Sequence, residues 1–407
     1  MVGGSQGPIC PASVRRDIVA LNQRWISRES DLARSENLVG STTGIVNELN
    51  PRVIGDRRSA LGVARAGAVL FRPVDEDRIG AIICGMLDEG NADSVQIPPP
   101  GKNNPGAEFA AHYLQCLREL SRSDIVLAAL IFRVKPSILR VRELSLAQLA
   151  VLAHSHEILF RPIQADALSS LIQASRAMFL RAEQNATLRG WTLLADECTE
   201  TPARDRLAEP AVASNRISQL HNILLLGSVG CRPRLIHALT HARRIEIQST
   251  MQQAGYDTSD PGGRRFSRTA SLIETPRSHI ISSLFLRNYL RACALYGVAN
   301  DSAVISPDAF ARAMLASMAA DVVDHIDPYL AHMTAKLYHE GDVSTRKCRC
   351  CSSQYLVCDN PVEVRGEVVS GDCPVCREIE SIRTGAPVFR LSGRRSRLSE
   401  VVASFSG

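Results

Sequence analysis

Apolar residues recur every three or four positions along most of this chain, which is the spacing of one face of an α-helix. Clear examples are Tyr113, Leu114, Leu117 and Leu120, the run from Leu220 to Leu226, and the segment from Ser278 to Gly297. This pattern predicts a mainly α fold. With 407 residues, 45% of them hydrophobic, the chain is long enough for two or three domains that each bury a core.

The first half of the chain contains an internal repeat. The tetrapeptide LFRP at residues 70–73 recurs 89 residues later at 159–162, and the same frame aligns Asp77 with Asp166. In each copy a helical pattern precedes LFRP, and a shorter helical pattern follows it. LFRP itself is expected to be a short extended segment that its proline ends. We expect two copies of one small helical module, packed on each other as a pseudo-dimer because each alone has a modest core.

Two segments rich in turn-forming residues divide the chain, at 96–106 and at 196–210. Beyond the second, Thr240 is expected to cap a helix that Gly255 ends, and further helices are expected near 307–318 and 321–338. The predicted domains are two small helical modules, a larger helical domain that holds a cysteine cluster, and a flexible basic tail, at 1–95, 107–195, 211–385 and 386–407.

Two cysteine pairs near the C-terminus form the strongest motif. Cys348 with Cys351, and Cys373 with Cys376, give CxxC twice with 21 residues between the halves. Each CxxC turn directs two sulfurs at one point, and two turns together supply the four thiolates of a tetrahedral zinc site. Since protein ligands fill all four positions, we expect one structural zinc per chain rather than a catalytic one. Cys350 competes with Cys351 as the second ligand, although a one-residue gap closes the chelate less well.

The same cysteines have a second interpretation, as the thiols of a disulfide oxidoreductase. A redox CxxC normally stands alone at the start of a helix, whereas here a second CxxC lies at ligand spacing. The sequence shows no nucleophile paired with a base, no glycine-rich phosphate loop and no paired carboxylates. We therefore expect no enzymatic activity.

Composition bears on location and partners. Six of the twelve cysteines are isolated along the chain, which suits a reducing cytoplasm. The longest apolar run, Ile125 to Phe132, is far too short to span a bilayer. We expect a cytoplasmic protein without a membrane segment. The net charge of +5 permits nucleic-acid binding without requiring it, so local clusters of basic residues decide the matter.

The best placed of these clusters is Arg346, Lys347 and Arg349, on either side of Cys348. A metal bound to the turn would hold these side chains rigid, where they would contact DNA phosphates. The alternative is that they only offset the negative charge of the thiolates.

Two other groups of basic residues are candidates for DNA contacts. His241, Arg243 and Arg244 lie near the start of the helix expected after Thr240, at a spacing typical of a helix-turn-helix. The alternative for them is an ordinary solvated helix face. Arg264 and Arg265, in a loop rich in Gly and Arg, and the arginines of the tail are expected to contact phosphates without sequence preference.

Residues 215–380 resemble FlhC, the C subunit of the bacterial flagellar master transcription activator. The resemblance rests on the segment LLLGSVGCRPRLIHALTHARRIEI, the helix HIISSLFLRNYL, and a helix that leads into CxCC…CxxC. Its partner subunit, FlhD, is similar to the segment ELSLAQLAVLAHSHEILFRPIQADALSSLI at 143–172. The first copy of the repeat resembles FlhD mainly through its likeness to the second. The resemblance implies two FlhD-like modules followed by a helical, DNA-binding FlhC-like domain with a four-cysteine zinc site.

That family assembles from four D and two C subunits, so a homodimer of this chain would supply the whole set in fixed ratio. The resemblance implies an activator that binds double-stranded promoter DNA and acts with RNA polymerase at flagellar or related promoters. The alternative is a protein-only scaffold, or a decoy that titrates flagellar regulators, because FlhD-like surfaces would mediate assembly in either case.

Overall fold

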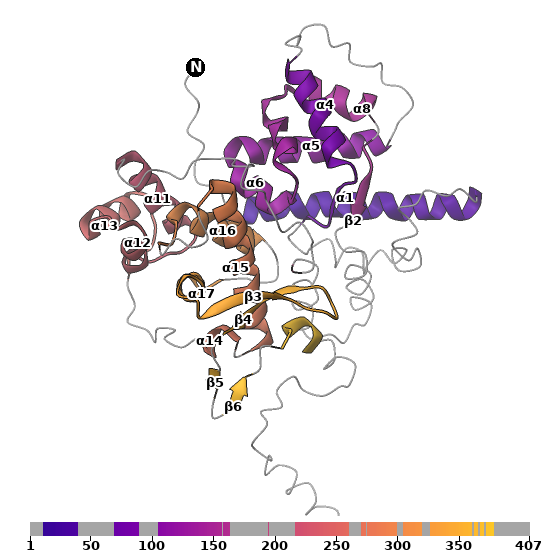
Figure 1. Ribbon diagram of the computed structural model, residues 1–407. Helices are drawn as coiled ribbons and strands as arrows, with labels where there is room; N and C mark the ends of the chain where they lie inside the picture. The colour runs from indigo at the N-terminus through magenta and orange to yellow at the C-terminus, as the bar shows by residue number, and fades with distance from the viewer. Residues whose placement is uncertain are drawn as a thin grey trace, which may run out of the picture.

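A computed structural model gives the fold (Figure 1), and it describes residues 11–39, 69–88, 105–156, 158–162, 194, 216–259, 270–273, 275–298, 304–319, 326–359, 362–364, 367–369 and 372–377. Helices dominate these residues, which confirms the predicted mainly α class. Within them the strands form three two-stranded antiparallel sheets. Among the helices of these ranges, none is both long enough and apolar enough to cross a membrane.

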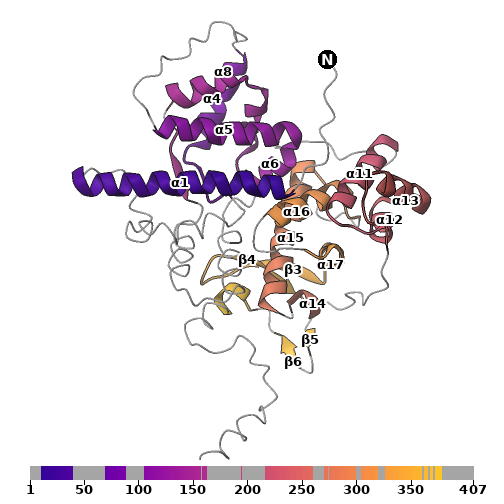
Figure 2. The same ribbon diagram turned by 180° about the vertical axis from the view of Figure 1, so that it is seen from behind.

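The described residues of the N-terminal part of the fold run from 11 to 162, with gaps. Its elements are α1 (Pro11–Val39), β1 (Phe71–Pro73), α4 (Glu76–Asp88), α5 (Pro105–Ser123), α6 (Ile125–Phe132), α7 (Pro136–Leu139), the 3₁₀ helix η1 (Arg140–Glu143), α8 (Leu146–Ser155) and β2 (Phe160–Pro162). α1 packs on one side of α5 and α8 on the other (Figure 1 and Figure 2).

The described residues of the C-terminal part run from 216 to 377, with gaps. Its elements are α11 (Arg216–Ser228), α12 (Pro233–Thr240), α13 (Arg244–Gln253), α14 (Ala270–Ile273), α15 (Pro276–Tyr296), α16 (Pro307–Ala319), α17 (Pro328–His339), β3 (Val343–Lys347), β4 (Gln354–Cys358), β5 (Val362–Val364) and β6 (Glu367–Val369). The long helix α15 is central, since α14, α16, α17 and β4 all pack against it.

The two copies of LFRP form β1 and β2, and they pair with each other. The pairing is antiparallel, with Arg72 opposite Arg161 and Phe71 opposite Pro162. Because Arg72 and Arg161 are equivalent positions of the repeat, a local two-fold axis passes between them. The expected contact between the two copies is confirmed at this pair of strands. Residues 163–193, where the second copy continues, lie outside the described residues.

Aromatic side chains from both copies form the centre of the N-terminal part. Trp25 stacks on Phe71 with ring centroids 4.9 Å apart, and Tyr113 meets Phe160 edge-on at the same distance. The equivalent residues Phe71 and Phe160 also contact each other, with centroids 5.7 Å apart. Each such pair contributes about 0.5–1.5 kcal/mol beyond its buried area, so these rings hold α1, α5 and both strands together.

Helix α6 joins the N-terminal part to the C-terminal part. It begins after Asp124, whose carboxylate accepts a hydrogen bond from the Leu127 amide at 2.9 Å. All of its residues from Val126 to Phe132 are buried, as expected for a helix that is apolar all round. It packs against α5 and also against α15 and α16 (Figure 1), so the apolar run is a junction inside the protein.

A buried ion cluster lies at the same junction. Arg312 of α16 has Nε 2.8 Å from a carboxylate oxygen of Asp124 and Nη1 3.1 Å from one of Asp308. Its guanidinium also lies over the Tyr296 ring, 5.4 Å from the centroid. The side chains of Arg312, Asp124 and Asp308 are only 12%, 7% and 6% exposed, so each charge depends on the others for compensation.

Two helix boundaries differ from the prediction. Thr240 does not cap the following helix, because it is the last residue of α12 and its hydroxyl donates a hydrogen bond to the Ile236 carbonyl at 2.7 Å. The following helix, α13, begins at Arg244. α17 begins at Pro328 rather than near residue 321, because the Asp327 side chain accepts a hydrogen bond from the Tyr329 amide at 2.8 Å and caps the helix there.

The helix predicted near 307–318 is confirmed as α16, whereas α5 begins at Pro105, inside the predicted linker 96–106, because proline suits the first turn of a helix. The segment 196–210 and the tail 386–407 lie outside the described residues, as do residues 96–104 of the first predicted linker. The division into FlhD-like and FlhC-like domains therefore stays a prediction.

Candidate metal centre and nucleic-acid interface

The first cysteine pair lies in the turn between β3 and β4. The Cys348 amide donates a hydrogen bond to the Ser353 carbonyl at 2.8 Å, and Ser352 takes the left-handed conformation, with φ 58°, that lets the chain reverse. The Cys350 amide points back to the sulfur of Cys348, at 3.4 Å. The tight turn brings Cys348 and Cys351 to the same side of the hairpin.

The second pair lies on a short helical turn at 374–377. Cys373 precedes this turn and Cys376 lies in it, and the Arg377 amide donates a hydrogen bond to the Cys373 carbonyl at 3.1 Å. Val375, between the two cysteines, is completely buried, so it anchors the turn in the core.

The four sulfurs converge on one point. Cys348 Sγ lies 3.6 Å from Cys376 Sγ, Cys351 Sγ lies 3.5 Å from Cys373 Sγ, and all four lie within 4.8 Å of one another. Tetrahedral zinc with bonds of about 2.3 Å would separate its sulfurs by about 3.8 Å. The residues present therefore fit a metal ion held by four cysteines, as the CxxC spacing predicted.

Hydrogen bonds between the sulfurs shift the pKa values of the cysteines. The bond between the Cys351 and Cys373 sulfurs lowers the pKa of Cys351 to about 5 and raises the pKa of Cys373. Burial, together with hydrogen bonds to Cys351 and Cys348, raises the pKa of Cys376 to about 12. A metal ion needs all four as thiolates, so its binding must release protons.

The spare cysteines of this region do not join the cluster. Cys350 is exposed, and its backbone amide, rather than its sulfur, contacts the cluster by a hydrogen bond to the Cys348 sulfur. Cys358 ends β4, where burial raises its pKa to about 11. The competition between Cys350 and Cys351 for the second position is thus decided in favour of Cys351.

Hydrogen bonds fix the hairpin to the helical core. His279 of α15 donates from Nε2 to the Leu356 carbonyl at 2.6 Å, and the Leu356 amide donates to Ser283 Oγ at 3.0 Å. The backbone carbonyl and the backbone amide of Leu356 in β4 are therefore both hydrogen-bonded to side chains of α15. Burial lowers the pKa of His279 to about 4, so its ring is neutral at pH 7.

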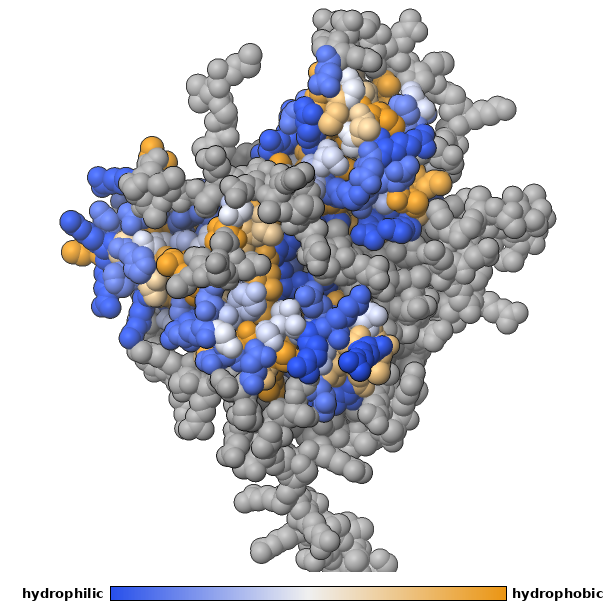
Figure 3. Space-filling view, in the orientation of Figure 1, coloured by the Kyte–Doolittle hydropathy of each residue, from blue (hydrophilic) through white to orange (hydrophobic). Residues whose placement is uncertain are grey.

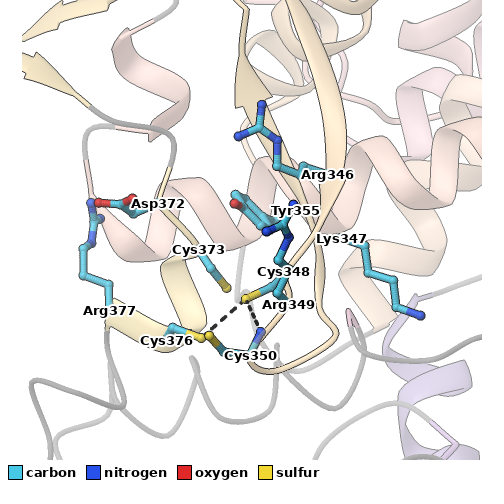
Figure 4. A pocket seen from close by; sticks show the side chains of 10 residues that line it. All are labelled: Arg346, Lys347, Cys348, Arg349, Cys350, Tyr355, Asp372, Cys373, Cys376 and Arg377. Atoms are coloured by element: carbon cyan, nitrogen blue, oxygen red, sulfur yellow. Dashed lines mark hydrogen bonds between the residues drawn. The ribbon is translucent and has the colours of Figure 1, made fainter.

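An open hollow of about 700 Å³ lies over the cysteine cluster (Figure 4). The predicted residues Arg346, Lys347 and Arg349 all line it and are exposed, and Lys347 extends away from the sulfurs. Arg377 and Asp372, which sequence reasoning missed, complete the lining on the side of the second cysteine pair. The only sequence signal for Arg377 is that it directly follows Cys376.

The net charge of this hollow shows whether its basic residues only offset the negative charge of the metal-bound thiolates. Four cationic side chains and one carboxylate line it. A divalent ion with four thiolate ligands carries two negative charges, so the lining more than offsets the cluster. The surface that remains is positive and suits an anion.

The other predicted DNA-binding residues lie elsewhere in the fold. His241, Arg243 and Arg244 are exposed in the turn between α12 and α13 and at the start of α13. They are not part of the hollow at the cysteine cluster. Arg264 and Arg265 lie outside the described residues.

Comparison of the chain with protein-family models, with curated proteins and with solved structures gives no match.

Proposed function

We propose that this protein is a zinc-containing transcription activator that binds double-stranded promoter DNA. The observation that carries this proposal is the basic hollow, in which Arg346, Lys347, Arg349 and Arg377 surround a four-cysteine cluster. Zinc is the proposed metal because a closed shell of four sulfurs is typical of its structural sites.

The position of these side chains favours phosphate binding. Arg346 and Lys347 end β3, which pairs with β4 along its whole length, and Arg349 lies in the turn that would be closed by the metal. Groups held by such a scaffold lose little conformational entropy on binding, so more of the electrostatic attraction appears as affinity.

The wider role rests on the resemblance to the flagellar activator. It supports a homodimer of this chain in the cytoplasm, which would act with RNA polymerase at flagellar or related promoters. The antiparallel pairing of β1 with β2 is in keeping with two FlhD-like modules that face each other within one chain. A protein-only scaffold would share these assembly surfaces but would not need the basic hollow.

Replacing Arg346, Lys347 and Arg349 together by Ala tests the proposal. The measurement is the affinity of the full chain for a fluorescent duplex that carries a flagellar promoter, over a range of salt concentrations. Loss of about three phosphate contacts should flatten the slope of log K against log salt by roughly 2–3, since each contact contributes about 0.9.

A matched control removes the same charge elsewhere. Arg16, Arg24 and Arg78 are exposed in the N-terminal part, away from the hollow. Their replacement by Ala should leave the slope close to that of the parent. Equal slopes for all three proteins would contradict the role of the hollow, and a parent protein that binds no duplex would favour the scaffold.

A further inference from the structure

Helices α11, α12 and α13 pack against one another and form a three-helix unit. Only three residues, 241–243, connect α12 to α13. A three- or four-residue turn between two crossing helices is the geometry of a helix-turn-helix, in which the second helix enters the major groove of DNA.

The turn between α12 and α13 is rigid. His241 takes the left-handed conformation, with φ 55°, at the position where such turns often have glycine. Ala242 is buried, its amide donates a hydrogen bond to Thr240 Oγ1 at 3.3 Å, and its carbonyl accepts one from His237 Nδ1 at 2.7 Å. These contacts fix the direction in which α13 leaves the turn.

Packing against α11 also holds the far end of α13. The ring of Tyr256, just beyond α13, lies so close to Gly227 of α11 that an added Cβ there would be 2.6 Å from the ring. In addition, Arg232 at the start of α12 forms an ion pair with Asp257. α13 is therefore supported at both ends, as a helix that positions side chains for recognition must be.

The two faces of α13 differ sharply. Ile247 and Met251 are buried against the rest of the unit. Ile245, Gln248, Ser249 and Gln252 are exposed, and their spacing of three and four residues places them in one continuous stripe. Ile245 is 80% exposed, which is unusual for so large an apolar side chain. Figure 3 shows the surface of this unit as mostly hydrophilic, with isolated apolar residues.

We propose that α13 reads base edges in the major groove of duplex DNA through this stripe. The proposal rests on the proposed function, because it assumes that the chain binds DNA, and it adds where the sequence is read. A helix with its side chains is about 10–12 Å wide and the major groove about 12 Å, so α13 fits it.

The chemistry of the stripe matches base edges. The amide of Gln248 or Gln252 can pair with adenine through two hydrogen bonds, and Ile245 can contact the methyl group of thymine. Arg243 and Arg244, both exposed at the start of α13, supply positive charge for the phosphates or for guanine. The basic hollow then provides affinity, and α13 provides preference for sequence.

Selection from a pool of duplexes with a randomised centre tests this division, with the full zinc-loaded chain as the protein. The parent should enrich one motif. Gln248→Ala and Gln252→Ala should each relax the motif at one position, with about 5- to 150-fold less discrimination there, while affinity for unrelated duplexes is unchanged. Thr250→Ala is the matched control, since Thr250 is partly exposed on the same helix but is not three or four residues from any member of the stripe.

The outcomes separate this proposal from the function on which it rests. If the parent binds duplexes but enriches no motif, or if both stripe variants enrich the parent's motif, α13 does not read bases and its exposed stripe is left for a protein partner. DNA binding through the hollow would stand in that case. If the parent binds no duplex at all, both proposals fail.

Discussion

At the scale of single residues, the cysteines of the C-terminal part divide into ligands and bystanders. Cys348, Cys351, Cys373 and Cys376 bring their sulfurs within 4.8 Å of one another, whereas Cys350 directs its sulfur elsewhere although it lies in the same turn. The spacing of CxxC predicted the first group because the turn is local. It also favoured Cys351 over Cys350, because a one-residue gap closes the chelate less well, and the structure confirms this choice.

Cys373→Ser and Cys350→Ser should therefore behave differently. The parent and Cys350→Ser should each contain one zinc per chain by elemental analysis, and Cys373→Ser should contain none. Structural zinc contributes about 10–16 kcal/mol of apparent binding energy that is also folding energy, so Cys373→Ser should also lose protease resistance in its C-terminal third. A full complement of zinc in Cys373→Ser would refute the ligand assignment.

The buried histidine of α15 predicts a pH dependence of stability. Burial lowers the pKa of His279 from 6.5 to about 4, so between these values the unfolded chain binds a proton that the folded chain does not. The contribution of His279 to the free energy of unfolding is fully present above pH 6.5. It is lost as the pH drops toward 4, which lowers stability by up to roughly 3 kcal/mol.

Chemical unfolding at several pH values checks this expectation. His279→Gln can keep a hydrogen bond to the Leu356 carbonyl but does not titrate, so its stability should fall less steeply below pH 6.5 than that of the parent. Zinc release at low pH affects both proteins alike, and the exposed residue His241, changed to Gln, serves as the control. Parallel pH profiles for parent and His279→Gln would show that His279 has no such role.

At the scale of elements, local sequence patterns predicted most helices but not which other elements each helix packs against. The apolar run at 125–132 is visible in the sequence, yet its length alone does not say that α6 lies between the two parts of the protein. Thr240 looked like an N-cap because threonine often caps helices. A threonine can also bond to the carbonyl four residues earlier in its own helix, and Thr240 does so with Ile236.

The junction at α6 gives a stability prediction. Arg312→Leu would leave Asp124 and Asp308 buried without their cation, which should lower the free energy of unfolding by about 3–5 kcal/mol. Lys135→Leu is the control, because its ion pair with Asp77 is exposed and screened by solvent. Denaturant titration measures both, and an Arg312 variant as stable as the Lys135 variant would mean that the junction does not depend on this cluster.

At the scale of the whole molecule, the repeat predicts that the two modules of one chain pair with each other. β1 and β2 use the equivalent positions of the two copies to meet within one chain, so this pairing is already satisfied. Nothing in the sequence pattern itself distinguishes a single chain from a dimer, and the expectation of a homodimer comes from the resemblance to a four-D, two-C assembly. Light scattering should give twice the chain mass of 44.3 kDa, and a mass near that of one chain would contradict the homodimer.

The central claim is that a metal-held basic surface binds duplex DNA. Fluorescence anisotropy of a labelled duplex, titrated with the zinc-loaded chain before and after removal of zinc by a chelator, tests it most directly. We predict salt-sensitive binding that is lost or strongly weakened on chelation and returns when zinc is added back, because the metal holds the turn that carries Arg349 between Cys348 and Cys351. Binding of equal strength with and without zinc, or no binding in either state, would contradict the account.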